Sequence, residues 1–196
     1  MSCGAQSQAG WVSDCDAGHL VTSILHHFSE DPSIVRFEPH IPRSNPKQRP
    51  AVWAIDAEHA PLYWFPRDCP RVTAWPRNSE ERVEFRKRLA TSAHRLHAIE
   101  ATWLDRMRST QLYRYDFDGT DLTRWPDASG QWISHEAVEP VAVTAMSDLV
   151  GAHLDAQIEL RLVPDLWPLV ELVKNGRWDF SCVRLVNATP PNIDTQ

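Results

Sequence analysis

Histidine, hydroxyl and carboxylate side chains are concentrated in the stretch HHFSEDPSI, residues 26–34. If the chain is extended here, side chains alternate in direction, so His27 and Ser29 project from one face and His26 and Phe28 from the other. An imidazole and a hydroxyl two residues apart on one strand can hydrogen-bond the same ribose or phosphate group. The pattern therefore predicts a binding site at the end of a strand.

Residues 29–32 have a structural interpretation as well. The order Ser-Glu-Asp-Pro is typical of a helix cap and first turn, with acidic groups near the positive end of the helix and proline early in it. On this interpretation Ser29 caps the backbone, whereas a buried imidazole at His27 would still need hydrogen-bond partners. Both interpretations stay open.

A second group of reactive side chains lies in APLYWFPRDCPRV, residues 60–72. Its prolines hold the backbone extended and reduce the entropy lost when Arg67 and Arg71 are fixed. Guanidinium groups bind oxyanions bidentately, so this segment suits a diphosphate. Tyr63 and Trp64 point in opposite directions, so one ring can stack on a flat heterocycle while the other packs inside.

The arginines of this segment also have a simpler interpretation. Arg67 and Asp68 can pair at a sheet edge over an aromatic core, since most charged surface residues are only solvated. Cys69 lies between basic residues, but no nearby base is evident in the sequence, so we interpret this thiol as part of the packing.

The elements that position these side chains are mainly short strands. Alternating or apolar runs predict strands at residues 24–28, 52–55, 72–75, 95–99, 111–117, 131–134, 138–143, 157–163 and 180–186. Helices are predicted at residues 79–89, 100–108, after a cap at Ser147, and at 165–175. Asn78 and Glu81 form a capping box for the first of these helices, and Gly176 is expected to end the last with a left-handed turn.

The strands outnumber the helices and show no regular βαβ rhythm, so the predicted class is α+β. Neither a G-x-G-x-x-G nor a G-x-x-x-x-G-K-[ST] loop occurs, which argues against a Rossmann enzyme and a P-loop NTPase. A flexible tail over residues 1–19, one domain over 20–188 and a second tail over 189–196 are expected.

Composition restricts the partners. The 196 residues are 42% hydrophobic, with a net charge of −6, so nucleic-acid binding is unsupported although not excluded. No apolar run is long enough for a membrane span or a secretory signal, and we expect a cytoplasmic protein without a membrane partner. The four cysteines are scattered, which argues against a disulfide framework. The sequence does not determine the oligomeric state.

Histidines are numerous, but their spacing does not define a metal site. No H-E-x-x-H or similar motif occurs, and His94 and His97 would share a face only in a helix, whereas a strand is predicted there. His153 lies on an apolar helix stripe, where a hydrogen-bonded core histidine is expected. A metal-dependent hydrolase is the least favoured alternative.

Two resemblances extend this interpretation. The blocks HFSEDPSI, VWAID, LYWFPRDCPR, LYRYDF, IELRLVPDLWPL and FSCVRLVNA resemble an uncharacterised bacterial family of unknown function over residues 24–188. More remotely, LHHFS is similar to the L-Y-H-x-[ST] strand of ADP-ribosyltransferases, and PLYWFPRDCP resembles a segment of their DNA-modifying toxin branch. His26 stands where that pattern usually has tyrosine.

The remote resemblance implies a split two-sheet α+β sandwich with NAD in its cleft. His27 and Ser29 would then orient the ribose, Tyr63 would lie near the nicotinamide, and Arg67 would approach the phosphates. The carboxylate that stabilises the oxocarbenium ion would be Glu136, in a stretch similar to the family's late strand.

Glu139 and Glu159 are substitutes for that carboxylate. For Glu159 a pair with Arg161 or another arginine is the stronger interpretation. We therefore predict an NAD-binding, ADP-ribosyltransferase-like enzyme with NAD as a substrate and no covalent cofactor. The alternative is a non-catalytic nucleotide-binding or structural protein of the same fold.

Overall fold

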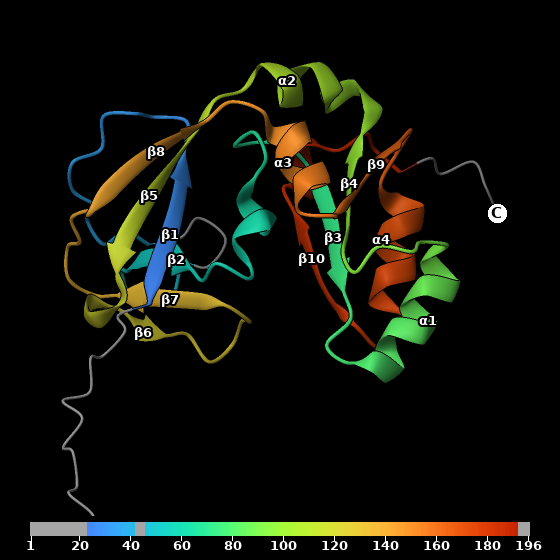
Figure 1. Ribbon diagram of the computed structural model, residues 1–196, viewed down its shortest axis with the longest axis horizontal. Helices are drawn as coiled ribbons and strands as arrows, with labels where there is room; N and C mark the ends of the chain where they lie inside the picture. Colours follow the sequence, from blue (N-terminus) through green and yellow to red (C-terminus); the bar gives the residue numbers. More distant parts are fainter. Residues whose placement is uncertain (1–22, 42–45, 192–196) are drawn as a thin grey trace, which may run out of the picture.

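The computed structural model describes residues 23–41 and 46–191 and contains two sheets (Figure 1). The first has the order β6-β7-β2-β1-β5-β8 and is antiparallel throughout. Its strands are β1 (Ile24–Ser29), β2 (Val52–Ile55), β5 (Leu112–Asp118), β6 (Thr123–Arg124), β7 (Gln131–Ser134) and β8 (Ala142–Met146). This sheet carries the HHFS strand predicted to contribute to a site.

The second sheet has the order β10-β3-β4-β9, and its β4 and β9 run parallel. Its strands are β3 (Arg71–Trp75), β4 (Leu96–Glu100), β9 (Glu159–Val163) and β10 (Asp179–Val183). The two sheets stand side by side, and the short 3-10 helix η1 (Ala60–Tyr63) lies between them (Figure 1). The predicted α+β class with two sheets is confirmed.

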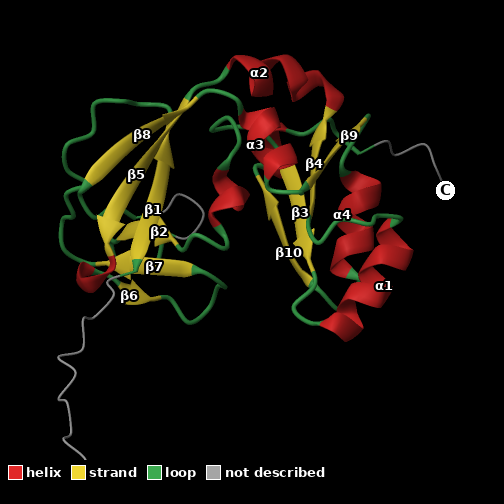
Figure 2. Ribbon diagram, in the orientation of Figure 1, coloured by secondary structure: helices red, strands yellow, loops and turns green. Residues whose placement is uncertain are grey.

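Helices cover the second sheet and the junction. Helices α1 (Ser79–Leu89) and α4 (Trp167–Lys174) lie on its outer face (Figure 2). Helices α2 (Leu104–Ser109) and α3 (Leu149–Asp155) lie over the junction of the sheets, and η2 (Ala101–Trp103), η3 (Gly119–Asp121) and η4 (Leu185–Asn187) are 3-10 turns. No helix of the described residues is long and apolar enough to cross a bilayer.

Three apolar clusters hold these layers together. Phe85 of α1 and Val170 of α4 pack with the outer face of the second sheet. Tyr115 and Phe117 of β5 form a cluster on the far face of the first sheet, and Met107 belongs to the cluster at the junction. Full burial of one such side chain stabilises the fold by about 1.5–3 kcal/mol. The junction cluster fixes the sheets relative to each other.

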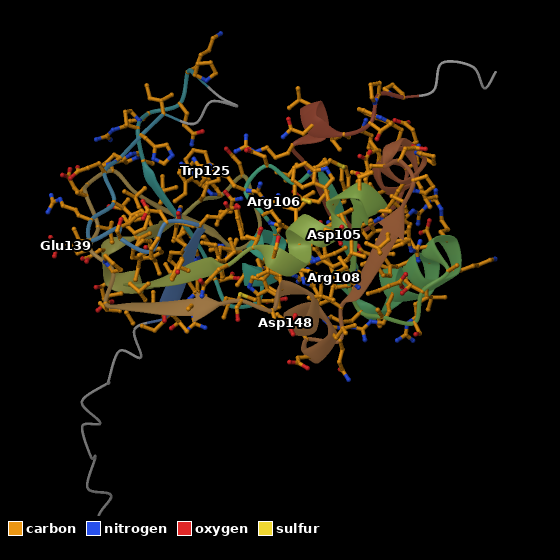
Figure 3. The ribbon with its side chains drawn as sticks, turned by 90° about the horizontal axis from the view of Figure 1, so that it is seen from above. Asp105, Arg106, Arg108, Trp125, Glu139 and Asp148 are labelled. Carbon is orange, nitrogen blue, oxygen red and sulfur yellow. The ribbon has the colours of Figure 1, made fainter. Side chains whose placement is uncertain are left out.

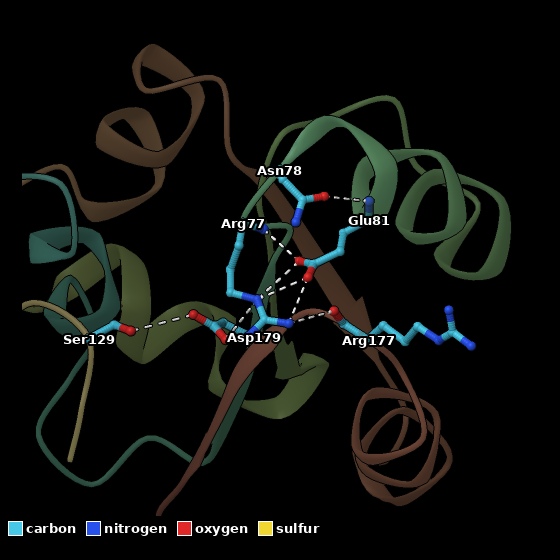
Figure 4. Close-up of polar contacts among 6 residues, drawn as sticks. All are labelled: Arg77, Asn78, Glu81, Ser129, Arg177 and Asp179. Atoms are coloured by element: carbon cyan, nitrogen blue, oxygen red, sulfur yellow. Dashed lines mark hydrogen bonds and ion pairs between the residues drawn. The ribbon is translucent and has the colours of Figure 1, made fainter.

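Helix α1 forms where the local sequence predicts it. The Asn78 side chain accepts a hydrogen bond from the backbone N–H of Glu81 at 2.9 Å, which satisfies one free donor of the first turn (Figure 4). Arg88 donates to Glu84 one turn away at 3.2 Å. The Glu81 carboxylate in turn accepts from the backbone N–H of Arg77 at 2.8 Å. The predicted cap and helix boundaries are confirmed, but the return bond of the predicted capping box is made to the N–H of Arg77.

Long-range contacts overrule the helix predicted after Ser29. The Ser29 hydroxyl accepts from the N–H of Asp31 at 3.1 Å, and the Asp31 carboxylate accepts from the N–H of Ser33, so the segment forms tight turns. The Tyr115 hydroxyl donates to the carbonyl of Asp31 and accepts from the N–H of Ile34. Because Tyr115 is buried in the first sheet, it holds these turns in place.

Other predicted boundaries were wrong for identifiable reasons. Asp148, not Ser147, caps α3, through a bond to the N–H of Gly151 at 2.7 Å. Gly176 has no positive φ; the ring of Trp178 lies where its side chain would be, so close packing requires the glycine.

Two strand boundaries also differ. The strand predicted at 138–143 begins at Ala142, since Val138 forms only an isolated bridge with Phe37. The strand predicted at 180–186 ends at Val183, because Arg184 is left-handed with φ of 57°.

The predicted N-terminal tail, residues 1–19, lies outside the described residues, as does most of the C-terminal one. Thr189, the first residue of the latter, donates hydrogen bonds to the buried carboxylate of Glu100 from its backbone N–H and its hydroxyl.

Candidate functional site

A split in the first sheet opens a pocket. Strands β1 and β2 pair at His26 and Ile55, and from there β1 continues toward Ser29 without further ladder pairs to β2. A cavity of about 600 Å³ lies at this divergence, within the range of about 300–1,000 Å³ common for small-molecule sites. Its wall comes from both strands, the segment after η1 and the end of β10.

His27 bridges the split. Its Nδ1 lies 2.9 Å from the carbonyl oxygen of Trp53 on β2, and because a carbonyl only accepts, Nδ1 carries the proton. Burial lowers the pKa of His27, the hydrogen bond to Trp53 partly opposes this, and the positive charge of Arg67 lowers the pKa further. The ring is therefore neutral near pH 7, its Nε2 is a hydrogen-bond acceptor, and the residue lines the pocket.

Arg71, at the start of β3, is a buried cation. The residue is 6% exposed, and its guanidinium donates to the carbonyls of Leu62 and Cys69, each at 3.2 Å. The group also lies over the Phe65 ring, 5.0 Å from the centroid. The described residues supply no carboxylate as its ion-pair partner, and burial lowers its pKa to about 10, so it stays charged at neutral pH.

Arg67 and Glu30 also line the pocket. The Glu30 carboxylate accepts from the backbone N–H of Arg67 at 2.9 Å and from Arg106 of α2 at 3.3 Å. Seen from above in Figure 3, Arg106 lies over the junction of the two sheets. Glu30 thereby holds the Arg67 segment beside the end of β1, while the Arg67 guanidinium has no carboxylate partner among the described residues.

Aromatic rings form the apolar part of the wall. The rings of Phe28 and Tyr63 are parallel within 3°, with centroids 6.5 Å apart, and both line the pocket. The Tyr63 hydroxyl accepts from Gln131 of β7 at 3.1 Å, which fixes the ring. Trp53 also lines the pocket, and its Nε1 is buried without a hydrogen-bond partner. Flat apolar faces and an unused donor are thus present together.

The structure brings together five of the six residues predicted for the site. The five that line the one pocket are His27, Ser29, Tyr63, Arg67 and Arg71. Sequence reasoning missed Glu30 and Arg184, which line it as well. Glu30 follows Ser29 directly in the sequence, and this position next to a predicted site residue could have indicated it.

Glu136, the sixth residue, lies elsewhere. It is exposed beyond the end of β7 and does not line the pocket, so the geometry gives its predicted catalytic role no support. Glu139 pairs with Arg36 at 3.3 Å at the outer end of the first sheet (Figure 3). Glu159 pairs with Arg161 at 2.6 Å, as the structural interpretation of that residue predicted.

A buried histidine pair lies beneath the pocket. His153 Nδ1 donates to the carbonyl of Leu149 at 2.6 Å, so its Nε2 accepts from His97 Nδ1 at 3.0 Å. That leaves His97 Nε2 unprotonated and without a partner. The ring of Phe65, a pocket residue, contacts both imidazoles. His153 is a hydrogen-bonded core histidine as predicted, and His97 is on a strand as predicted.

The described residues contain no group of three or more metal-ligating side chains arranged to hold an ion.

Cys69 is fully buried, and burial raises the pKa of its thiol to about 12, which disfavours the reactive thiolate and agrees with the predicted packing role. Asp68 lies near Arg184, at 3.9 Å, rather than pairing with Arg67.

The fold and the site define an α+β protein with a pocket at a split sheet, and the wall of that pocket includes three arginines and one glutamate. Within that class, the model of a family of unknown function, DUF6886, matches residues 26–188, and the chain belongs to this family. Neither the comparison with curated proteins nor that with solved structures finds a match.

Proposed function

We propose that the pocket binds a phosphorylated nucleotide, with NAD as the first candidate. The observation that carries this proposal is Arg71, a buried guanidinium with no carboxylate partner among the described residues. An unpaired buried charge costs several kcal/mol of folding free energy, and an anionic ligand removes that cost on binding. A phosphate group has the charge and the acceptor geometry that a guanidinium binds best.

The other groups of the pocket match the remaining parts of a nucleotide. The neutral His27 presents an acceptor for a ribose hydroxyl, and the Phe28 and Tyr63 rings offer flat faces to a heterocycle. Arg67 is a second cation for the phosphates. A positive pocket in a chain of net charge −6 also concentrates anions locally.

ADP-ribosyl transfer is the reaction that such a pocket would carry out on NAD. The bond between the ribose C1′ and the nicotinamide nitrogen breaks, its electron pair leaves with nicotinamide, and a nucleophilic acceptor forms the new bond to C1′ and releases its proton to water. A carboxylate must stabilise the positive charge that develops on the ribose. Glu30 is the carboxylate in the wall of the pocket, so it replaces Glu136 as the candidate for this role.

Thermal unfolding in the presence of ligands tests binding. At about 100 times Kd, a ligand adds about 2.7 kcal/mol to the stability, which raises Tm by about 5–10 °C for a chain of this size. We expect this rise with NAD and ADP-ribose, and none with adenosine, which lacks phosphate. Equal effects of adenosine and ADP-ribose, or none from either, would refute the proposal.

Substitutions link the effect to the pocket, and product analysis tests the chemistry. Arg71→Met and the exposed Arg67→Gln should both reduce the Tm rise, whereas Arg177→Gln, an exposed arginine that does not line the pocket, should leave it unchanged. Chromatographic detection of free nicotinamide tests the transferase reaction. NAD binding without nicotinamide release, in wild type and in Glu30→Gln alike, would favour the non-catalytic alternative.

A further inference from the structure

A second guanidinium approaches Arg71 from the neighbouring strand. Residue Val183, the last of β10, pairs with Arg71 of β3, and Arg184 follows directly after the end of that strand. Both arginines line the pocket, and the positive charge of Arg184 contributes to the lowered pKa of Arg71. The fold therefore holds two like charges close together.

The backbone of Arg184 is unusual. Its φ of 57° and ψ of 27° are left-handed, a conformation that costs a non-glycine residue about 1–2 kcal/mol. Arg184 precedes η4, and its carbonyl accepts from the N–H of Asn187 at 2.8 Å. The Asn187 side chain donates to the carbonyl of Asp68 at 2.8 Å, which ties this turn to the Arg67–Arg71 segment. The turn therefore holds an arginine where glycine would be less strained.

The protein itself does little to neutralise this pair. Asp68 is the one described carboxylate in ion-pair range of Arg184, at 3.9 Å, and both side chains are largely exposed. Surface pairs of this kind contribute little. None of the carboxylates in the described part of the chain forms an ion pair with Arg71. Repulsion between the two guanidiniums therefore persists unless an anionic ligand lies between them.

We infer that Arg71 and Arg184 form a two-guanidinium subsite that selects ligands carrying a diphosphate over those with a single phosphate. This inference rests on the proposed nucleotide site and names its substrate class. One oxyanion group meets the buried Arg71 at the pocket wall, and the adjacent one meets Arg184 at the rim. In this inference Arg67, which also lines the pocket, is not part of the subsite.

Titration calorimetry with inorganic pyrophosphate, inorganic phosphate, ADP and AMP tests the subsite. We expect wild type to bind ADP more tightly than AMP, and pyrophosphate more tightly than phosphate, by about 10- to 100-fold, the effect of one charge-assisted hydrogen-bonded pair. Arg184→Gln should remove most of that preference and leave the AMP affinity nearly unchanged. Arg177→Gln, the matched exposed control, should keep it.

Arg184→Gly separates folding from binding. Glycine relieves the left-handed backbone, so Tm should stay the same or rise by about 2–4 °C, while the preference for ADP is lost. A preserved preference in both Arg184 variants, or equal binding of ADP and AMP by wild type, would overturn the subsite and leave the nucleotide proposal standing. Pyrophosphate binding that depends on Arg184, without binding of any nucleotide, would instead overturn the nucleotide proposal. If neither pyrophosphate nor nucleotides bind, both are wrong.

Discussion

Replacing the buried His97 and His153 by leucine should flatten the dependence of stability on pH. Both side chains are fully buried, and burial lowers the pKa of His153 from 6.5 to about 4 and that of His97 well below its ordinary value. The positive charge of Arg95 lowers the His97 pKa further. Each imidazole is therefore neutral in the folded protein and binds a proton readily once the chain unfolds.

The sign of the effect follows from proton linkage. Because the folded pKa of His153 lies below the unfolded value of 6.5, the unfolded state binds more protons in between, so stability is complete above pH 6.5 and is lost as the pH falls toward 4. From these two values, His153 alone accounts for a loss of about 2 kcal/mol between about pH 7.5 and pH 5. His97 adds a loss of the same sign.

Urea denaturation at several pH values measures this loss directly. The double variant His97→Leu, His153→Leu should lose at least about 2 kcal/mol less than wild type between about pH 7.5 and pH 5. His135→Gln is the control, because that ring lies outside the buried pair and is bonded at the surface to the carbonyl of Pro50. Identical slopes for wild type and the double variant would show that the pair does not govern acid sensitivity.

Three further substitutions test the fold and the pocket. Asn78→Ala removes the α1 cap and should cost about 1 kcal/mol of unfolding free energy, measured by urea denaturation; an unchanged midpoint would contradict the cap. Gly130→Ala should cost at least about 2 kcal/mol in the same assay, because φ is 73° and the new Cβ would overlap the His59 ring; wild-type stability would contradict that geometry. Phe28→Ala should reduce the affinity for ADP-ribose about 10-fold or more in calorimetry by removing a stacking face. Undiminished affinity would show that no ring of the ligand stacks on Phe28.

The sequence was sufficient where structure is local. The cap at Asn78 and the boundaries of α1 depend on side chains within one helical turn, and these were predicted correctly. That His27, Ser29, Tyr63 and Arg67 meet was predicted from the remote resemblance, and all four line the pocket. The α+β class followed from the number and spacing of such strands.

What the sequence could not supply depends on contacts between distant residues. The turns after Ser29 form because the hydroxyl of Tyr115, far along the chain, hydrogen-bonds to the backbone of both Asp31 and Ile34. Arg184 reaches the pocket because of the register of β10 on β3 and because its backbone is left-handed. An arginine in a sequence does not indicate a left-handed backbone, since L-residues other than glycine rarely adopt one. Glu136 was predicted from a resemblance, and the path of the chain beyond β7 leaves it outside the pocket.

A crystal structure of the protein soaked with ADP-ribose is the most direct test of the central claim. We expect electron density for the ligand between the diverging ends of β1 and β2, with a phosphate on the Arg71 guanidinium and a ribose hydroxyl on His27 Nε2. Ligand density at another surface, or an empty pocket at saturating ADP-ribose, would contradict the account.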